Sequence, residues 1–370
     1  MKIILVSNKV NTFSLAYRNE ISILLKLGHE IVWMANFSGF IGDRNEIPCK
    51  TIHMDIFSYP FHKANLKAFL QLSDVIKEIY FDAMICTTPI GGFIGRLVAK
   101  KNKVPLVVYS AHGFLFYKGA PLINRTVYKW QEQIMARWTD YIITINDEDY
   151  IAANKYFKIK KDQIFKIHGA GVTVGNKRYD KRALKRKELG ISEDAFILIS
   201  AGFLNPNKNN KVIINAMNIL KNNNIYYLLC GEGEEKEYLN KLVDKYELGN
   251  NVKFLGYRTD IIELLSISDV FVMPSFREGV PRALLEAMDL GIPCIGSDTR
   301  GIRELIGINK EGGLLCNPKS SKEFASAINY LYCNPSIFEC MATRNQKEVA
   351  RYSSEQVKQE LYVIYSKIFR

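Results

Sequence analysis

The sequence predicts an α/β fold of two domains, each with a parallel sheet between layers of helices. The chain has 370 residues, which is more than one typical hydrophobic core organises. Short apolar runs alternate with longer helical patterns along its whole length, and such alternation indicates parallel strands covered on both faces. A glycine-rich passage without periodicity, residues 169–175, separates two series of these units. We therefore expect domains at 1–170 and 171–350, and a C-terminal helix at 351–370 that returns towards the N-terminal domain.

Each apolar run is assigned to a strand and each longer pattern to a helix. In the first series, strands are expected at 3–7, 30–34, 51–54, 83–87, 106–110 and 141–145, and helices at 14–27, 63–79, 92–101 and 122–138. In the second series, strands are expected at 196–202, 226–230, 252–255, 270–274, 294–296 and 313–315. The last helix, 353–369, begins with the start signal Ser-Ser-Glu. Ligands bind beyond the carboxyl ends of parallel strands, so the loops after strands supply the candidate site residues.

Composition excludes several classes of protein. With 48% hydrophobic and 24% charged residues, the chain is typical of a soluble globular protein. No apolar run approaches the roughly 18 residues of a membrane-spanning helix, and the N-terminal apolar run is short enough to be a strand rather than a signal peptide. The seven cysteines are odd in number and scattered, which argues against a disulfide framework or structural zinc and fits a reducing cytoplasm.

The formal net charge of +12 is concentrated in the N-terminal half, where residues 1–175 carry 22 Lys and Arg against 14 Asp and Glu. A basic, aromatic-rich surface suits nucleic acid, an anionic membrane face or an anionic substrate. No nucleic-acid motif accompanies the charge, so nucleic acid is not expected as a partner. The basic stretch 177–187 is interpreted as a solvated helix face rather than a binding site.

The most informative motif is E-G-V-P-R-A-L-L-E-A-M-D-L-G-I-P, residues 278–293. Pro281 suits the first position of a helix that runs to about Leu290, where Gly291 stops it. The N-terminus of this helix attracts phosphate through its free N–H groups and its dipole, and Gly279 lets a ligand approach the main chain.

Two glutamates of this motif, Glu278 and Glu286, flank the phosphate site. Carboxylates repel phosphate, but they accept hydrogen bonds from pairs of neutral hydroxyls. A diphosphate flanked by two polyols is a nucleotide sugar. The alternative is an ordinary amphipathic helix with one surface glutamate and one buried glutamate.

With the other loops that follow strands, this motif resembles the retaining family-4 glycosyltransferases of GT-B fold. The motif matches the family's most specific signature almost position for position, and the similar layout covers nearly the whole chain. The segments His112-Gly-Phe, Tyr117-Lys-Gly-Ala-Pro and 143–150 resemble the branch that works on bacterial capsule, O-antigen or exopolysaccharide chains. The resemblance implies two Rossmann-like domains whose parallel sheets face a central cleft, with the C-terminal helix packing back across the junction.

The resemblance also implies roles for individual residues. Glu286 would accept hydrogen bonds from the nucleotide ribose and Glu278 from the donor sugar. Lys208 would offset the charge that grows on a UDP-type leaving group, and His112 would lie near the transferred sugar, so His112, Lys208 and Glu278 are the catalytic candidates. The other donor-side candidates are Gly202, Phe203, Gly231, Gly233, Tyr257, Arg258, Gly279, Val280, Pro281 and Arg282, and the acceptor-side candidates are Asn8, Thr12, Gly113, Phe114 and Lys118.

The sequence departs from the family at two points. Phe203 occupies a position where the family often has an arginine for the diphosphate, and Arg282 or Arg258 is expected to supply that charge. Asn11 and Thr12 replace the usual glycine pair of the first loop. His112 could instead be a hydrogen-bonded structural histidine, and Lys208 a surface lysine, although a cation at a helix start opposes the helix dipole.

Acidic and cysteine residues have structural explanations. The triplet Asp147-Glu148-Asp149 imitates a D-x-D metal site, but it opens a helix, where acidic residues stabilise the N-terminus. We expect no cofactor and no obligatory metal. Cys86, Cys230 and Cys294 fall in strand patterns and are interpreted as core residues.

The expected reaction moves a hexose-type sugar from a nucleoside diphosphate to an acceptor hydroxyl with retained anomeric configuration. No carboxylate is left to act as a nucleophile, which favours front-face attack driven by proximity and electrostatics. The acceptor is expected to be lipid-linked and to dock on the N-terminal domain of a cytoplasmic protein that works at the inner face of the membrane. The segment 114–130 interleaves aromatic and basic residues and fits either a membrane surface or a core helix. The rival functions are a nucleotide-sugar epimerase and a non-catalytic sugar-nucleotide sensor.

Overall fold

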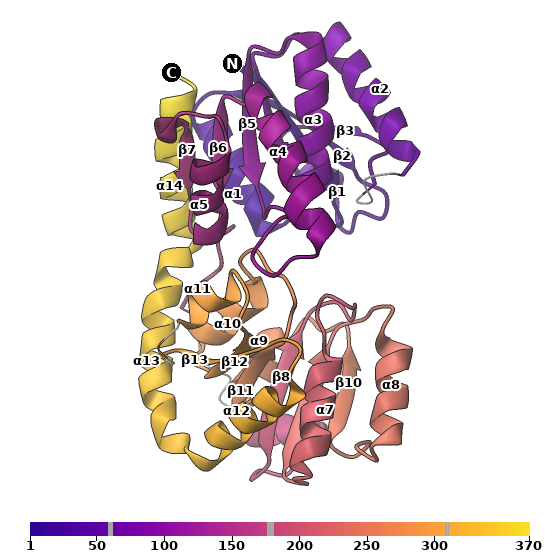
Figure 1. Ribbon diagram of the computed structural model, residues 1–370, viewed down its shortest axis with the longest axis vertical. Helices are drawn as coiled ribbons and strands as arrows, with labels where there is room; N and C mark the ends of the chain where they lie inside the picture. Colours follow the sequence, from indigo (N-terminus) through magenta and orange to yellow (C-terminus); the bar gives the residue numbers. More distant parts are fainter. Residues whose placement is uncertain (58–61, 176–180, 308, 310) are drawn as a thin grey trace. The chain divides into compact units, whose positions relative to one another are not determined.

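The computed structural model describes residues 1–57, 62–175, 181–307, 309 and 311–370. Two compact units divide the chain, and each has its own sheet (Figure 1). The first unit comprises Met1–Gly171 and Ser354–Arg370, and the second comprises Val172–Ser353. Within the described residues, no helix combines the length and the hydropathy needed to cross a bilayer.

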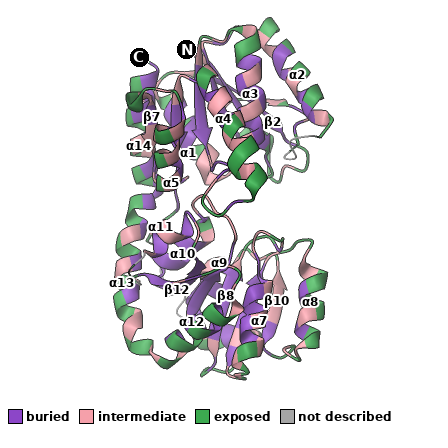
Figure 2. Ribbon diagram, in the orientation of Figure 1, coloured by how far each residue is buried: buried purple, intermediate pink, exposed green. Residues whose placement is uncertain are grey.

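The first unit contains a seven-stranded sheet in which every recorded strand pair is parallel, in the order β3-β2-β1-β4-β5-β6-β7. Its strands are β1 Lys2–Lys9, β2 Glu30–Asn36, β3 Lys50–His53, β4 Ala83–Thr87, β5 Leu106–Ala111, β6 Tyr141–Thr144 and β7 Ile164–Lys166. Its helices are α1 Leu15–Lys26, α2 Ala64–Glu78, α3 Pro89–Asn102, α4 Lys129–Met135, α5 Asp147–Tyr156 and α14 Ser354–Ile368. The central strands are buried, the edge strand β3 has no buried residue, and the helices expose one side (Figure 2).

The second unit contains a six-stranded parallel sheet in the order β10-β9-β8-β11-β12-β13. Its strands are β8 Phe196–Ala201, β9 Ile225–Cys230, β10 Val252–Gly256, β11 Val270–Met273, β12 Cys294–Ser297 and β13 Gly313–Cys316. Its helices are α6 Arg182–Glu188, α7 Lys211–Leu220, α8 Lys236–Lys245, α9 Ile261–Ser266, α10 Arg282–Asp289, α11 Ile302–Ile306, α12 Ser321–Cys333 and α13 Phe338–Val349. Two buried apolar clusters fill the space between the sheet and these helices.

The predicted α/β class and parallel sheets are confirmed, with differences at particular elements. The short edge strand β7 was not predicted, because its three residues carry too little apolar pattern. Helix α3 begins earlier than expected, with Pro89 at its first position, where a missing N–H costs nothing. Gly92 lies inside this helix and lets it pack closely on the sheet, since a Cβ there would lie 2.4 Å from Cε2 of Tyr109. The predicted helix 122–138 is divided into a π-helical turn, Asn124–Tyr128, then α4 and a final 3-10 turn.

The basic stretch 177–187 is a solvated helix face only in part: in its described residues Lys181 and Lys187 are exposed, while two other basic residues are buried, and residues 176–180 lie outside the described residues. On α6, Lys185 and Arg186 are buried. Lys185 Nζ lies 2.7 Å from Oδ2 of Asp260, and Arg186 Nη2 lies 3.1 Å from Oδ2 of Asp269. The charges of α6 are therefore used inside the second unit.

The acidic triplet at the start of α5 serves as a structural N-terminus. Asn146 is the N-cap, and its side chain accepts a hydrogen bond from the Asp149 amide. Glu148 accepts a hydrogen bond from the Lys118 amide, and Asp147 pairs with Lys166 at 2.5 Å. These carboxylates hold the loop after β5 and the strand β7 in place.

Candidate active site

The carboxyl ends of four neighbouring strands, β10, β9, β8 and β11, border one cavity of the second unit, about 770 Å³ in volume. Most of the donor-side candidates line it, as do Lys208 and Glu278. The candidates that line it are Gly202, Phe203, Lys208, Gly231, Tyr257, Arg258, Glu278, Val280, Pro281, Arg282 and Glu286. Because loops after adjacent parallel strands emerge at one edge of a sheet, residues up to 85 positions apart meet here.

Glycines allow the loops after β8 and β9 to approach one another. Gly231 has φ +147°, and a Cβ on it would lie 1.9 Å from the carbonyl oxygen of Gly202. Gly202 has φ +145°, and a Cβ there would lie 3.3 Å from Cε of Lys208. Both residues therefore need to be glycine, and the Lys208 side chain passes over Gly202.

Lys208 is held against Glu278 on the wall of the cavity. Its Nζ lies 2.8 Å from Oε1 of Glu278, and both side chains are largely buried. The two loops that carry this pair are joined by the backbone, since the Phe276 amide donates to the Asn207 carbonyl. The Asn207 side chain donates in turn to the carbonyl of Arg277, at 2.9 Å. The ion pair is therefore fixed by its supporting loops.

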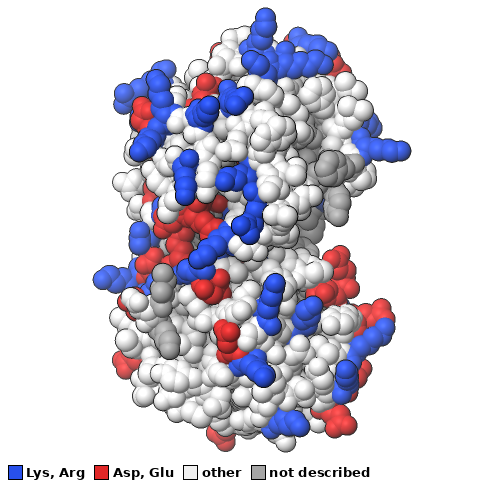
Figure 3. Space-filling view, in the orientation of Figure 1, with Lys and Arg blue, Asp and Glu red and all other residues white. Residues whose placement is uncertain are grey.

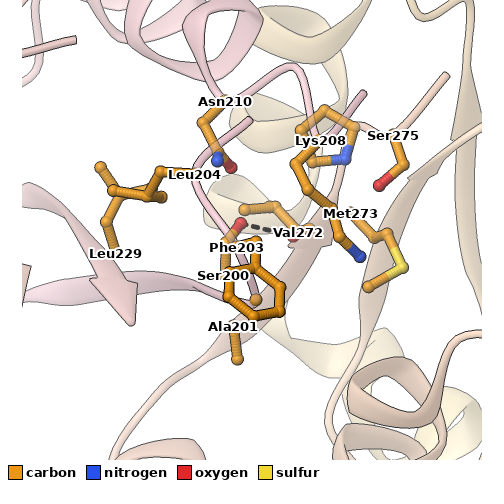
Figure 4. Close-up of a pocket in the computed structure, with 12 residues that line it drawn as sticks. Ser200, Ala201, Phe203, Leu204, Lys208, Asn210, Leu229, Val272, Met273 and Ser275 are labelled. Atoms are coloured by element: carbon orange, nitrogen blue, oxygen red, sulfur yellow. Dashed lines mark hydrogen bonds between the residues drawn. The ribbon is translucent and has the colours of Figure 1, made fainter. Parts of the chain in front are cut away.

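A second, water-sized pocket of about 10 Å³ adjoins Lys208. In Figure 4 the side chains of Phe203, Met273 and Lys208 surround it, and the dashed line marks the hydrogen bond from Ser200 Oγ to the Val272 carbonyl. The hydroxyl of Ser275, which also lines this pocket, is buried. The small pocket provides room for one water molecule below the lysine.

Glu286 lies one turn into α10 and pairs with Arg282 on the same helix face, with 2.7 Å between Arg282 Nε and Glu286 Oε1. The prediction that Pro281 occupies the first helical position was wrong by one residue. Pro281 has extended backbone angles and is the N-cap, so α10 begins at Arg282. The helix ends as expected before Gly291, whose φ is +65°.

Arg258 is less available than Arg282. Its guanidinium donates two hydrogen bonds to Asp260, at 2.7 and 2.5 Å, and Asp260 also forms an ion pair with Lys185. These hydrogen bonds hold the pKa of the Asp260 carboxyl well below its usual range, so the carboxylate stays charged. Arg282 instead has a 62% exposed side chain and lies at the start of α10.

Two predicted glycines are placed differently from the rest, since neither Gly233 nor Gly279 is among the described residues that line the cavity. Gly233 packs on the backbone of Leu204, where a Cβ would lie 2.2 Å from the carbonyl oxygen. The carbonyl oxygen of Gly279 packs against Gly301, where an added Cβ would lie only 2.0 Å from it. Gly233 is therefore a close-packing position, and the backbone of Gly279 packs against Gly301.

Sequence reasoning missed several residues that line or support this cavity. The additional lining residues are Ala201, Cys230, Glu232, Thr259, Ile261, Ile262, Met273 and Ala283. Arg300 donates to the carbonyl of Glu278 and holds that loop from below. The lining residues also follow strands or begin helices, so that signal could have found them, whereas nothing near Arg300 in sequence points to its partner.

The acceptor-side candidates and His112 belong to the first unit, at the carboxyl ends of β1 and β5. Asn8 is buried, and its Oδ1 accepts a hydrogen bond from the Gly91 amide at 2.6 Å, while Thr12 is exposed. His112 lies beside Tyr17, with ring centroids 6.5 Å apart, and burial lowers its pKa to about 4. Its imidazole is therefore neutral at physiological pH.

One acceptor-side prediction was wrong. The Phe114 side chain is buried, with its ring stacked on Phe116 at 5.1 Å and edge-on to Phe157 at 5.3 Å. It is part of the core because the chain turns inward after Gly113, whose φ is +122°. Lys118 is exposed on the following turn.

The three strand cysteines are buried, which confirms the core interpretation of Cys86 and Cys294. Cys230 is also buried, but it additionally forms part of the cavity wall at the end of β9. Burial raises the pKa of its thiol to about 12, so the thiol stays protonated and acts as an apolar surface.

Comparison with known proteins follows the division into two units. Residues 2–146 match the family described as Glycosyl transferase 4-like, and residues 181–349 match the family described as Glycosyl transferases group 1. The putative glycosyltransferase EpsD of Bacillus subtilis is 36% identical over 315 residues, which are 83% of this chain and 82% of the relative. A relative from Escherichia coli is 31% identical over 71% of this chain and 70% of the relative's length. It is described as UDP-Gal:alpha-D-GlcNAc-diphosphoundecaprenol alpha-1,3-galactosyltransferase.

Solved structures show the same fold. The crystal structure of Anabaena HepE in complex with UDP-glucose has a TM-score of 0.79 with this chain, at 19% sequence identity. The match covers 99% of this chain and the whole HepE chain. The chain therefore belongs to the family-4 glycosyltransferases of GT-B fold, and it is a glycosyltransferase of the branch that builds bacterial surface polysaccharides.

Proposed function

We propose that this glycosyltransferase moves a hexose-type sugar from a UDP-sugar donor to a lipid-linked surface-polysaccharide acceptor and retains the anomeric configuration. The observation that carries the proposal is the pairing of cations with carboxylates along one wall of the 770 Å³ cavity, Lys208 with Glu278 and Arg282 with Glu286. The relative that is described by UDP-galactose and a diphosphoundecaprenol acceptor supports the donor and acceptor classes, as does the UDP-glucose complex of HepE.

These two ion pairs suggest how the donor binds. A diphosphate offers better partners to both cations than the carboxylates do, while ribose and sugar hydroxyls offer donors to both carboxylates. Donor binding would thus exchange two internal ion pairs for four contacts of the kinds each group prefers. The free carboxylates would then bind the rings on either side of the diphosphate, in agreement with the roles implied for Glu278 and Glu286.

Arg282 is the better replacement for the arginine that is missing at Phe203. It lies at the start of α10, within the first turn that also offers free N–H groups, and its exposed side chain pairs with Glu286. Arg258 would have to give up the two hydrogen bonds to Asp260 that fix it. Lys208 and Arg282 would therefore stabilise the leaving diphosphate together.

The retaining outcome is proposed from the resemblance to the retaining family. Among the described residues that line the cavity, Glu278 and Glu286 are assigned to hydroxyls and Glu232 pairs with Lys236 at 3.0 Å, so no carboxylate is assigned as a nucleophile. Front-face attack, in which the departing phosphate oxygen takes the acceptor proton, fits this arrangement. His112 is neutral and would act as a hydrogen-bonding group towards the transferred sugar rather than as an acid.

We further propose that the reaction requires no metal, since Lys208 and Arg282 line the cavity and would offset the charge on the leaving diphosphate. We also propose that the enzyme works in the cytoplasm at the inner face of the membrane, which the lipid-linked acceptor named for the Escherichia coli relative supports. The N-terminal unit, which carries most of the positive charge, would receive the acceptor.

The proposal is tested with a panel of nucleotide sugars and a short-chain diphosphate-linked sugar acceptor that is soluble in water. Transfer from a UDP-hexose, with the anomeric coupling constant of the donor preserved in the product by proton NMR, is expected, and chelator is expected to leave the rate unchanged. Inverted product would contradict the retaining mechanism. Conversion of the donor without acceptor would indicate an epimerase, and binding without release of UDP would indicate a sensor.

The role of Lys208 is tested by the same assay. Lys208→Ala is expected to lower kcat by about 10²–10³-fold because a preorganised cation is lost from the leaving group. Lys208→Arg, which keeps the charge, should retain more activity, and the KM for acceptor should change little in either variant. Equal turnover in Lys208→Ala and the unmodified enzyme would remove Lys208 from the mechanism.

A further inference from the structure

The segment that follows β5 has two parts with opposite environments. Phe114 and Phe116 are buried in the core of the first unit. Downstream, four large apolar side chains are exposed around the π-helical turn and α4, and we name them the apolar stripe: Leu122, Ile123, Val127 and Trp130, with 73%, 56%, 50% and 65% of their surface exposed. Figure 2 shows the outer side of this helical segment as exposed. The first part is therefore core and the second part is surface.

The apolar stripe lies along one helical segment. Ile123, Val127 and Trp130 follow one another at intervals of four and three residues, about one turn of the π-helical segment and of α4, so they occupy neighbouring positions along it. An isolated exposed leucine needs no explanation, but several large apolar residues exposed together mark an interaction surface. The tryptophan belongs to the residue type that prefers the boundary between water and lipid.

Basic residues accompany the stripe along the chain. Between residues 117 and 138 the chain has four basic residues, Lys118, Arg125, Lys129 and Arg137. Its single acidic residue there, Glu132, is buried and pairs with Arg96 at 2.8 Å. Lys155 of α5 adds to this charge, because Lys155 and Lys129 both contact the ring of Tyr156. Lys and Arg side chains are spread over the face of the first unit that carries α4 (Figure 3).

The stripe is held in place from beneath. The Arg96–Glu132 pair joins α3 to the inner side of α4. The Asn124 side chain donates to the Leu115 carbonyl at 2.8 Å, and the Lys118 amide donates to Glu148 at 2.7 Å. The apolar side chains therefore cannot turn into the core without breaking these bonds, so their exposure is built into the fold.

We propose that the apolar stripe is the surface by which the protein docks on an anionic lipid bilayer. The aliphatic side chains would enter the region below the headgroups, Trp130 would lie at the boundary, and the basic residues would pair with lipid phosphates. The inference rests on the proposed function in one respect, since a lipid-linked acceptor lies in such a bilayer. Docking there brings acceptor-side residues of the same unit to the membrane that holds the acceptor.

The proposal is tested by flotation of the full-length protein with vesicles of phosphatidylcholine, with and without phosphatidylglycerol. The unmodified protein is expected to float with the anionic vesicles and to dissociate partly at high salt. The triple variant Ile123→Gln, Val127→Gln, Trp130→Gln should bind at least about tenfold more weakly. The pair Arg125→Gln, Lys129→Gln removes charge and keeps the stripe. Its binding to anionic vesicles should therefore fall to the level seen with phosphatidylcholine alone.

A matched control uses two other exposed apolar residues of the same unit, Leu66 and Leu70 on α2, which are 68% and 51% exposed. The pair Leu66→Gln, Leu70→Gln should float like the unmodified protein. Flotation of the triple variant at the unmodified level, or equal loss in the α2 pair, would overturn the proposal. Failure of the unmodified protein to bind anionic vesicles would also overturn it.

A second measurement does not depend on the folding of the triple variant. Lipids brominated on the acyl chain should quench Trp130, seen as the fluorescence difference between the unmodified protein and Trp130→Phe; no quenching would overturn the proposal. Transfer to the water-soluble acceptor should be unchanged in the triple variant, since the stripe is outside the donor cavity. Vesicle binding is measured without donor or acceptor, so an error in the assigned reaction leaves it unaffected.

Discussion

At the scale of single residues, the donor cavity contains two arginines that could replace the cation missing at Phe203, and their environments differ. Arg282→Gln should raise the KM for a UDP-sugar by about 10–100-fold, because one charged hydrogen bond to the diphosphate is lost. The matched variant Arg258→Gln should change KM less, because its guanidinium is already bound by Asp260. Initial rates at varied donor concentration check this, and a larger effect at Arg258 would reverse the assignment.

His112 determines a pH dependence whose sign follows from its lowered pKa of about 4. Between pH 6.5 and 4 the unfolded chain binds a proton that folded His112 does not, so this group makes the fold less stable as pH falls through that window. Above this window the imidazole is neutral, and His112 should cause no step in kcat/KM near pH 6.5. An imidazole NMR titration, assigned with His112→Gln, should give a midpoint near 4; a midpoint at 6.5 or above would contradict the burial argument.

At the scale of elements, α14 is attached to α1 by buried polar contacts within the first unit (Figure 1). The Ser354 hydroxyl donates to Asn19 at 2.8 Å, and the Tyr365 hydroxyl lies 2.5 Å from Oε1 of Glu20. His168, after β7, lies 2.6 Å from Glu360 on the same helix. The C-terminal helix is therefore an integral part of the first unit, where it packs on α1.

Burial raises the pKa of Glu20 to about 7. Its folded carboxyl keeps a proton that the unfolded chain loses near 4.5, so stability from this group is present below that value and is lost as pH rises through 7. Glu20→Gln mimics the neutral acid and should be more stable than the unmodified protein at pH 8, by on the order of 2 kcal/mol, and similar at pH 4.5. Urea unfolding at the two pH values checks this. Tyr365→Phe should steepen the pH dependence, because the tyrosine hydrogen bond lowers the pKa of Glu20.

The elements also show which features the sequence could predict. Buried parallel strands such as β4 consist of apolar residues along their whole length, so local pattern locates them. The motif around α10 located the two glutamates of the cavity. The ion pairs that hold the site were not predictable, because Lys208 meets Glu278 and Lys185 meets Asp260 through loops that are far apart in sequence. The same holds for Phe114, whose hydrophobicity fits both a core and a ligand surface.

At the scale of the whole molecule, the first unit is built from two distant parts of the chain, whereas the second unit is one continuous segment, Val172–Ser353. All residues that line the donor cavity belong to this segment. Its sheet has buried apolar clusters formed only by its own residues. Recognition of the nucleotide and diphosphate should therefore need no residue of the first unit, while transfer should need His112 and the acceptor-side loops.

The segment 172–353, expressed alone, should bind UDP with a Kd within about tenfold of the full-length value, because each proposed contact to the nucleotide and diphosphate is retained. It should transfer no sugar, since the acceptor-side residues are missing. Isothermal titration with UDP tests the affinity, and amide NMR shows whether the segment is folded. Lys208→Ala in the same segment should weaken binding, whereas His112 variants of the full-length protein should bind UDP normally. A folded segment that does not bind UDP would show that the first unit supplies part of the nucleotide site.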